Sequence, residues 1–471
     1  MSGLSWSLGM RFIGQLFTWA VTLLVIRLLS PTDYGLMELA TVIVNFWAMI
    51  GELGLGTAII QRQNLSEKDL QAIFGLILLI SLFLCLSLFG AAPLVAKFYK
   101  EPQLTLIIWF LSLVFLLSGL AAVPYNLLLR DLEYRKIALI EFTGTIAGAI
   151  TTLTLAMLGL KVWALIFGFL SLRVTTLIGL QWVRPFLKWP RFAFDGLWSI
   201  FVFSGNVTLA RILWYIYSFA VASLIIGKVL GNESLGVYGI ALFLACLPMD
   251  KVSSILNQVA MPAFSSIQDK PELAGAHFLK ATRILSIIAV PVFFGISSVG
   301  PEIITIFLKE KWTDAIIPMQ IIALAVPLRM VRNLMMPALL GLDQSKINLI
   351  NESIALVLMS VAFYVATLWG LVGVSLVWLL IFPLVFALNL PQTAKALHIT
   401  PLDIFRGMAS PVFSGLIMLA CVYLVRSLLP QGLNDVIRLL IFIATGGFVY
   451  LGMTMLINRS GMDEIVRLVK K

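Results

Sequence analysis

Apolar segments long enough to cross a membrane follow one another along almost the whole chain. Of the 471 residues, 60% are hydrophobic and 12% are charged. A helix needs roughly 20 mostly apolar residues to cross the hydrocarbon core of a bilayer. Because lipid offers no water to hydrogen-bond the backbone, such segments must satisfy their own N–H and C=O groups, as a helix does. The chain is therefore predicted to be an all-α polytopic membrane protein.

The apolar runs predict about fourteen transmembrane helices. Their expected ranges are 8–29, 36–60, 70–96, 104–129, 137–158, 160–183, 197–227, 235–262, 280–300, 315–340, 347–368, 370–391, 405–428 and 434–457. Membrane-spanning strands are only about 10 residues long, so these runs do not fit a barrel. The first run lacks the basic start and small-residue cleavage site of a signal peptide, and we expect it to be retained as a helix.

The distribution of positive charge predicts the orientation of the chain. The formal net charge is +10, and the even-numbered loops with the C-terminal tail carry about twice as many Lys and Arg residues as the odd-numbered loops. Cytoplasmic loops are the ones enriched in these residues, so both termini are expected to be cytoplasmic. A basic inner face also suits anionic lipid headgroups, and membrane lipids are expected partners, whereas no nucleic acid is.

Sequence signals for a cofactor or for catalysis are absent. Cys85, Cys246 and Cys421 are scattered through apolar runs, and His277 and His398 lie far apart in loops. This spacing fits neither a disulfide framework nor a zinc site. The chain has no P-loop, nucleophile elbow or zinc-protease motif. We therefore expect no cofactor, no metal, no ATP hydrolysis and no enzymatic activity.

A weak internal repeat suggests two similar halves. The segment from Arg27 to Leu36 matches that from Lys228 to Val237, because each has a basic residue, a short polar turn and a glycine that begins the next apolar run. Internal repeats are common in transporters. The expected organisation is a six-helix lobe over 1–190, a second six-helix lobe over 191–395, and two further helices with a cytoplasmic tail over 396–471.

Arginines within the apolar runs are the clearest functional signal. Arg329 and Arg332, with Asn333 beside them, lie about a dozen residues, or roughly 15 Å, from the cytoplasmic end of their predicted helix. A charged side chain at that depth usually faces a bundle interior or a water-filled cavity. Guanidinium groups match the oxygens of phosphate in a bidentate fork. These two arginines are the primary candidates for binding an anionic substrate.

Further polar side chains lie on single helical faces. Arg11 and Gln15 begin such a stripe in the first run, and Arg211 occupies the corresponding place in the seventh. These side chains are expected to line a polar cavity, although each arginine also fits the alternative of reaching to the inner headgroups.

The second and eighth runs contain the embedded acids. Asn45 and Asn257 are expected to line the cavity, and Glu38, Glu52 and Asp250 are candidates for carrying a coupling ion. Alternative interpretations stay open for the acids. Glu38 and Glu52 fit solvated helix ends, and Asp250 is next to a lysine that neutralises it.

The stretch R-L-L-S-P-T-D-Y-G at 27–35, followed by E-L-G-L-G-T-A-I-I-Q at 52–61, resembles the N-terminal signature of Wzx-type polysaccharide flippases. The likeness is closest to the branch that includes the colanic acid exporter. Further similar pieces are A-P-L-V-A-K-F-Y at 92–99 and P-Y-N-L-L-L-R at 124–130. The resemblance covers most of the chain and is most specific in its first third.

This resemblance implies membership of the MOP superfamily, with two pseudo-symmetric six-helix lobes around a central cationic cavity and two C-terminal helices that form a groove for a polyprenyl tail. The implied function is alternating-access translocation of an undecaprenyl-pyrophosphate-linked oligosaccharide across the bacterial cytoplasmic membrane, for exopolysaccharide or lipopolysaccharide biosynthesis. The expected partners are the lipid-linked oligosaccharide and other membrane proteins of polysaccharide assembly.

Two other functions remain as alternatives. An ion-coupled small-molecule antiporter of the same superfamily would carry organic cations in an acidic cavity, whereas this chain embeds more arginines than carboxylates. A membrane-embedded polysaccharide polymerase or ligase would need a substantial periplasmic segment to bind acceptor sugar, and the outward loops are all short.

Overall fold

The structure is a computed structural model that describes residues 2–51, 59, 66–191, 209, 212–430, 432–459 and 461. The side chains of 2–13, 16, 50, 51, 250–259 and 271 are not described. Helices make up the regular structure of the described ranges, and no strand occurs in them. These ranges hold 11 helical stretches long and apolar enough to cross a membrane. One of them, Ser345–Ala396, covers two predicted runs. The all-α polytopic fold is confirmed.

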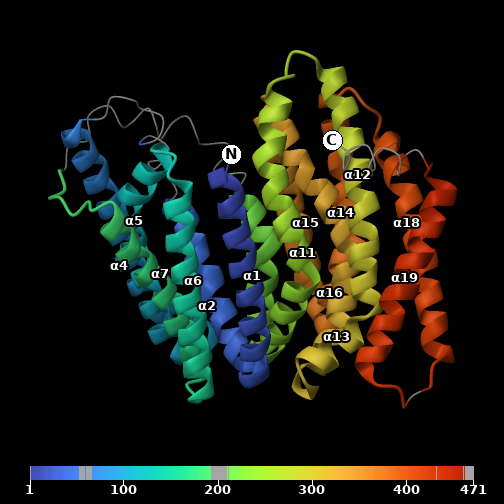
Figure 1. Ribbon diagram of the computed structural model, residues 1–471, viewed down its shortest axis with the longest axis horizontal. Helices are drawn as coiled ribbons and strands as arrows, with labels where there is room; N and C mark the ends of the chain where they lie inside the picture. The colour runs from blue at the N-terminus through green and yellow to red at the C-terminus, as the bar shows by residue number, and fades with distance from the viewer. Residues whose placement is uncertain are drawn as a thin grey trace. The chain divides into compact units, whose positions relative to one another are not determined.

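The chain divides into two compact units, which we describe separately. The first comprises Met1–Thr208 and Ile226–Gly236, and the second comprises Leu209–Ile225 and Val237–Lys471. Helices of the first unit are α1 (Ser2–Leu28), α2 (Pro31–Gly51), α4 (Glu67–Tyr99), α5 (Gln103–Arg130), α6 (Tyr134–Met157) and α7 (Val162–Val183). Figure 1 shows α4 to α7 running side by side.

The second unit contains most of the remaining elements. In chain order the helices are η1 (Ile216–Ala220), α10 (Val221–Val229), α11 (Gly231–Ser265), α12 (Pro271–Ser298), α13 (Gly300–Phe307), η2 (Glu310–Ala315), α14 (Ile316–Gly341), α15 (Ser345–Ala366), η3 (Thr367–Trp369), α16 (Gly370–Leu376), η4 (Val377–Ile381), α17 (Phe382–Ala396), α18 (Pro401–Leu428) and α19 (Asp435–Ile457). Helices α10 and α11 cross from one unit to the other.

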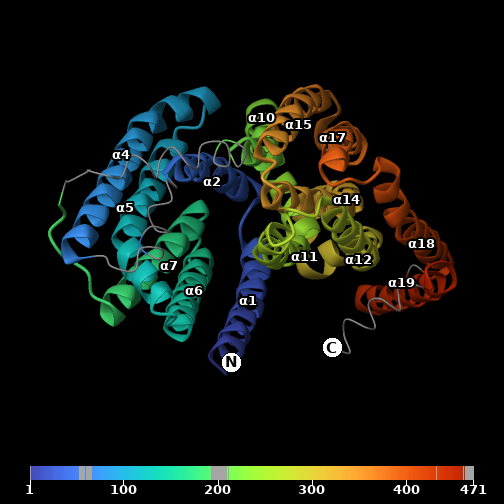
Figure 2. The ribbon, with the colours of Figure 1, turned by 90° about the horizontal axis from the view of Figure 1, so that it is seen from above.

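Helix α14 is the interior helix of the second unit. A larger share of it is buried than of any other membrane-spanning helix described, and it packs against α12, α15, α16, η4 and α17. Helices α18 and α19 pair at the margin of this unit, where α18 also packs on α12 (Figure 2). Side chains on α14 are therefore held among neighbours from several helices.

The turn that carries the family resemblance is a helix cap. Ser30 Oγ donates to Asp33 Oδ2 (2.6 Å) and accepts from the Asp33 backbone N–H (3.2 Å), while the Ser30 N–H donates to the same carboxylate (3.0 Å). Such a capping box satisfies free N–H groups at a helix start. The other oxygen, Oδ1, accepts from the backbone N–H of Val162 at the start of α7 (3.1 Å). Asp33 therefore caps α2 and fastens α7 to it.

The two segments of the internal repeat contact each other within the first unit. A Cβ added at Gly35 would lie 1.8 Å from the carbonyl oxygen of Asn232, and one added at Gly236 would lie 1.8 Å from that of Pro31. Both glycines are near the start of a helix that follows a short turn, Gly35 in α2 and Gly236 in α11. Each matched segment thus supplies a glycine that lets the backbone of the other approach.

Candidate functional site

Arg329 and Arg332 project from α14 into the interior of the second unit. They are three residues apart, which places them on one side of the helix. Their exposed fractions are 5% and 4%. Pro327 lies just before them inside the helix. A guanidinium is rarely buried this deeply unless it is paired, so their contacts determine what the site can do.

Arg332 has a carboxylate partner that we did not predict. Its Nη2 lies 3.2 Å from Glu352 Oε2, and Glu352, on α15, is 3% exposed. Its Nη1 donates to the hydroxyl of Tyr217, whose ring centroid is 5.0 Å from the guanidinium carbon. The Nε atom has no hydrogen-bond partner in the described structure. One donor of the guanidinium is thus left over for another acceptor.

Arg329 contacts an aromatic ring and a thiol. Its guanidinium carbon lies 4.0 Å from the ring centroid of Trp378, and Nη1 donates to Cys246 Sγ (3.3 Å). Trp378 is fixed in turn, because its indole N–H donates to the Tyr238 hydroxyl (2.8 Å). Among the side chains that the structure describes, no carboxylate pairs with Arg329. The two arginines and Glu352 therefore sum to one excess positive charge.

Both arginines contact π-helical turns. Tyr217 lies in the π-helix η1, and Trp378 lies in the π-helix η4. Single π-turns inside α-helices are frequent at functional sites. They widen the backbone locally and aim these two rings at α14. The result is a cationic site walled by aromatic rings, in which electrostatic interactions are strong because water is excluded.

Buried amides lie beside Glu352. The Nδ2 of Asn351 donates to Thr393 Oγ1 (3.1 Å), and the Nδ2 of Asn389 donates to the Asn351 carbonyl oxygen (3.3 Å). The side-chain oxygens of Asn351 and Asn389 have no donor in the described structure. These amides connect α15 to α17.

The other predicted site residues fall into two groups. Gln15, Glu38 and Asn333 are half-buried, whereas Asn45 is exposed. The remaining candidates lie outside the described side chains, and their roles stay predictions: Arg11, Arg211, Glu52, Asp250 and Asn257. Of the predicted site, the structure brings together Arg329 and Arg332. No group of three metal-binding side chains occurs among the residues described.

Sequence reasoning missed Glu352, Tyr217 and Trp378. Glu352 carried a usable signal, since it is a carboxylate within an apolar run and follows Asn351 directly. The aromatic residues carried none, because tyrosine and tryptophan are abundant in membrane helices. Tyr217 and Trp378 differ from other aromatic residues in lying in π-turns, which the sequence does not reveal.

A second charged cluster joins α13 to the α18–α19 pair. Glu302 is 4% exposed. It accepts from Arg426 Nη2 (2.5 Å) and lies 3.9 Å from Arg438 Nη2. Arg426 also donates to the carbonyl oxygen of Ser298 (2.8 Å) and lies against the ring of Phe442. One carboxylate is shared by two arginines from different helices, so it ties the C-terminal pair to the rest of its unit.

We expect Glu302→Gln to lower the stability of the protein more than Arg438→Ala does. The first change leaves the half-buried Arg426 without its charge partner, which costs about 3 kcal/mol when a buried pair is broken. The second removes a long, partly exposed contact worth about 0–1 kcal/mol. Thermal unfolding of the purified variants measures both. Equal shifts in the two variants would show that Glu302 is not the shared anchor.

Comparisons with known proteins agree with this architecture. A family model described as "Polysaccharide biosynthesis protein" matches residues 24–317. The succinoglycan biosynthesis transport protein ExoT of Rhizobium meliloti is 24% identical, over 94% of this chain and 90% of its own length. The lipopolysaccharide biosynthesis protein WzxC of Escherichia coli is 27% identical, over 65% of this chain and 63% of its own.

Two solved structures share the fold. The lipid II flippase MurJ, in an inward closed conformation, matches with a TM-score of 0.72 and 15% identity, covering 95% of this chain and 98% of its own. An inward-facing multidrug resistance transporter of the MATE family, in the MOP superfamily, matches with a TM-score of 0.60 and 16% identity, covering 81% and 95%. The fold is that of the MOP transporters, and the chain belongs to the polysaccharide biosynthesis protein family.

Proposed function

We propose that this protein translocates an undecaprenyl-pyrophosphate-linked oligosaccharide from the cytoplasmic to the periplasmic leaflet of the bacterial inner membrane. The excess positive charge at Arg329 and Arg332 carries the proposal, because a buried cationic site suits the pyrophosphate common to such lipids. Membership of a polysaccharide biosynthesis family supports it, as do the transport functions in the names of similar proteins.

The arginines would hold the pyrophosphate by exchanging partners. Glu352 neutralises Arg332, so the site does not bury two bare cations. An incoming pyrophosphate replaces that carboxylate and adds bidentate bonds to planar guanidinium groups. Movement of α14 relative to α15 would separate the ion pair and open the site. The oligosaccharide would follow in the hydrated part of the pathway.

Other predicted residues complete the proposed pathway. Arg11 and Arg211 would extend the cationic surface, and Gln15, Asn45, Asn257 and Asn333 would hydrogen-bond the passing sugars. Because the chain has no nucleotide-binding motif, an ion gradient or the substrate gradient would drive transport. Glu38, Glu52 and Asp250 are the acids proposed for ion coupling.

The orientation is tested with reporter fusions. We expect fusions after Lys188 and after Lys471 to report a cytoplasmic position, because the basic loops lie on that side. A fusion after Pro430, between α18 and α19, should report the periplasm and serves as the control. A periplasmic signal after Lys188 or Lys471 would reverse the proposed direction of the transport pathway.

Deleting the gene in its host tests the function itself. We expect surface polysaccharide to disappear and lipid-linked repeat units to accumulate in the cytoplasmic leaflet, where they stay inaccessible to externally added glycosidase. Accumulation of unpolymerised repeat units in the periplasmic leaflet would instead indicate a polymerase or ligase. Normal polysaccharide together with increased drug sensitivity would indicate a small-molecule antiporter.

A further inference from the structure

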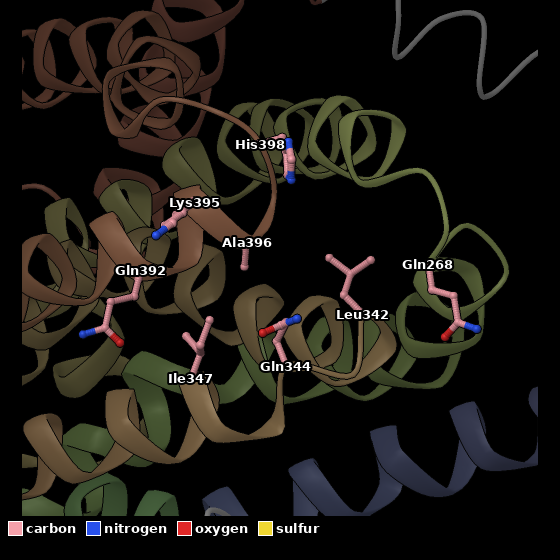
Figure 3. A pocket seen from close by; sticks show the side chains of 8 residues that line it. All are labelled: Gln268, Leu342, Gln344, Ile347, Gln392, Lys395, Ala396 and His398. Atoms are coloured by element: carbon pink, nitrogen blue, oxygen red, sulfur yellow. The ribbon is translucent and has the colours of Figure 1, made fainter.

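A pocket with a mixed polar and apolar lining opens at one end of the second unit, away from the arginine site. Its volume is about 500 Å³, within the range of roughly 300–1,000 Å³ typical of small-ligand sites. Figure 3 shows the side chains from three places that line it. These are the segment after α11 (Gln268), the α14–α15 connection (Leu342, Gln344 and Ile347) and the end of α17 with the residues that follow it (Gln392, Lys395, Ala396 and His398).

Hydrogen bonds fix the backbone at the helix ends around this pocket. At the end of α14 the N–H of Gln344 donates to the Leu339 carbonyl oxygen (2.8 Å), and at the end of α17 the N–H of Ile399 donates to that of Ala394 (3.0 Å). Both ends thus form the six-to-one bond of a Schellman motif. In addition, Gly275 on α12 packs against the carbonyl oxygen of Leu397, where a Cβ would lie only 2.2 Å away. The segments that follow α14 and α17 therefore have a fixed backbone conformation where they line the pocket.

His398 adopts a backbone conformation that favours glycine. Its φ is 52°, in the left-handed region that costs a non-glycine residue roughly 1–2 kcal/mol. Glycine is the usual residue at this position of a Schellman motif. Here an imidazole stands there instead and lines the pocket.

The lining suits a ligand rich in hydroxyl groups. Gln344 and Gln392 each offer an amide that donates and accepts, which suits hydroxyl groups on a sugar, whereas Gln268 lies at the far side of the pocket (Figure 3). Lys395 supplies a cation that projects from the same side of α17 as Gln392, three residues before it. The rest of the lining is apolar and is formed by Leu342, Ile347 and Ala396.

The net positive charge of the residues near the pocket favours a ligand with one negative charge. Lys270 and Lys346 lie within two residues of lining positions, as do Asp269 and Asp343. With Lys395 the sum is a single positive charge. Apart from the His398 imidazole, no aromatic ring lines the pocket, so it offers little for stacking a nucleotide base.

We propose that this pocket binds an acidic sugar, a uronic acid or a similarly charged unit of the glycan, on the cytoplasmic side before translocation. The side of the membrane and the source of the sugar rest on the proposed function. The basic loops that form the pocket are the ones expected in the cytoplasm. The pocket would therefore recognise the glycan, whereas the arginine site recognises the pyrophosphate.

Saturation-transfer NMR on the full-length protein in phosphatidylcholine nanodiscs tests this assignment. The probes are methyl glucuronide, the uncharged methyl glucoside, and glycerol 3-phosphate as a soluble headgroup. We expect saturation transfer to the glucuronide, with at least tenfold weaker binding of the glucoside. Replacing Lys395 and Gln392 together by alanine should raise the Kd for the glucuronide about tenfold or more, because a charged hydrogen bond and an amide bond are lost.

The matched control is Lys280→Ala, which removes an exposed lysine that is neither in the lining nor among the charges counted at the pocket, and it should leave binding unchanged. Binding of glycerol 3-phosphate as tight as that of the glucuronide would overturn the proposal in favour of a lipid headgroup site. So would absence of transfer to the glucuronide. Either result leaves the deletion phenotype untouched. Conversely, a deletion strain with normal polysaccharide would reject the flippase function while the sugar site stands.

Discussion

Arg332→Ala should abolish polysaccharide export and destabilise the protein, whereas Arg329→Met should abolish export with little effect on stability. Arg332 neutralises Glu352 inside the second unit, and removing one partner of a buried ion pair costs about 3–5 kcal/mol. Arg329 has no carboxylate partner among the described side chains. Methionine fills its place and removes a buried charge that no described carboxylate neutralises, which offsets the lost contact with Trp378, itself worth about 1–2 kcal/mol. Surface polysaccharide and thermal unfolding of purified protein measure the two effects.

Two further variants separate substrate binding from folding. Combining Arg332→Met with Glu352→Gln removes both charges, so stability should return towards that of the wild type while export stays lost. Arg332→Lys keeps the charge but loses the planar fork, and export should be rescued only in part. Normal export by the double variant would place the pyrophosphate site elsewhere. A large loss of stability in Arg329→Met would assign that arginine to folding.

Alanine at Gly35 or Gly236 should prevent accumulation of folded protein. In each case the new Cβ would lie 1.8 Å from a backbone carbonyl oxygen, a distance that no change of side-chain rotamer can relieve. Overpacking costs about 1–3 kcal/mol even where side chains can yield, so we expect a loss at or above the top of that range. Membrane abundance and the elution profile of solubilised protein report the result.

Gly90→Ala is the matched control for this pair. Gly90 lies inside α4, and nothing is within 4 Å of an added Cβ. Alanine there should stabilise the helix by about 1 kcal/mol. Because Gly35 and Gly236 belong to one contact, the double variant should be less harmful than the sum of the single ones. Normal folding of either single variant would mean that the two segments do not pack this closely.

Hydrophobicity alone predicts the helical fold, because length and apolarity suffice to identify a span. The charged residues of α14 are predictable for the same reason, since Arg329 and Arg332 interrupt an apolar run. Their partners are not. Tyr217 and Glu352 are 115 and 20 residues from Arg332 in sequence, and no local pattern connects them. The pairing depends on how η1, α14 and α15 pack in three dimensions.

The helix boundaries in the second half could not be predicted from the sequence either. The runs at 347–368 and 370–391 predict two plain helices, but the second is a succession of α16, η4 and α17. A π-turn inserts one residue into the helical pattern without altering hydrophobicity, so Val377–Ile381 reads like any other apolar segment. The aromatic wall beside Arg329 depends on that insertion.

The capped turn at Ser30–Asp33 has a consequence for assigning cargo to related sequences. Both carboxylate oxygens of Asp33 accept from backbone or side-chain donors within the first unit, and the residue is buried, so its side chain serves to hold the helices together. A database search keyed to this motif will collect transporters that share a method of assembly, whatever glycan each one carries. To group these transporters by the glycan they carry, one would compare other sequence positions, in loops that contact the polar part of the substrate.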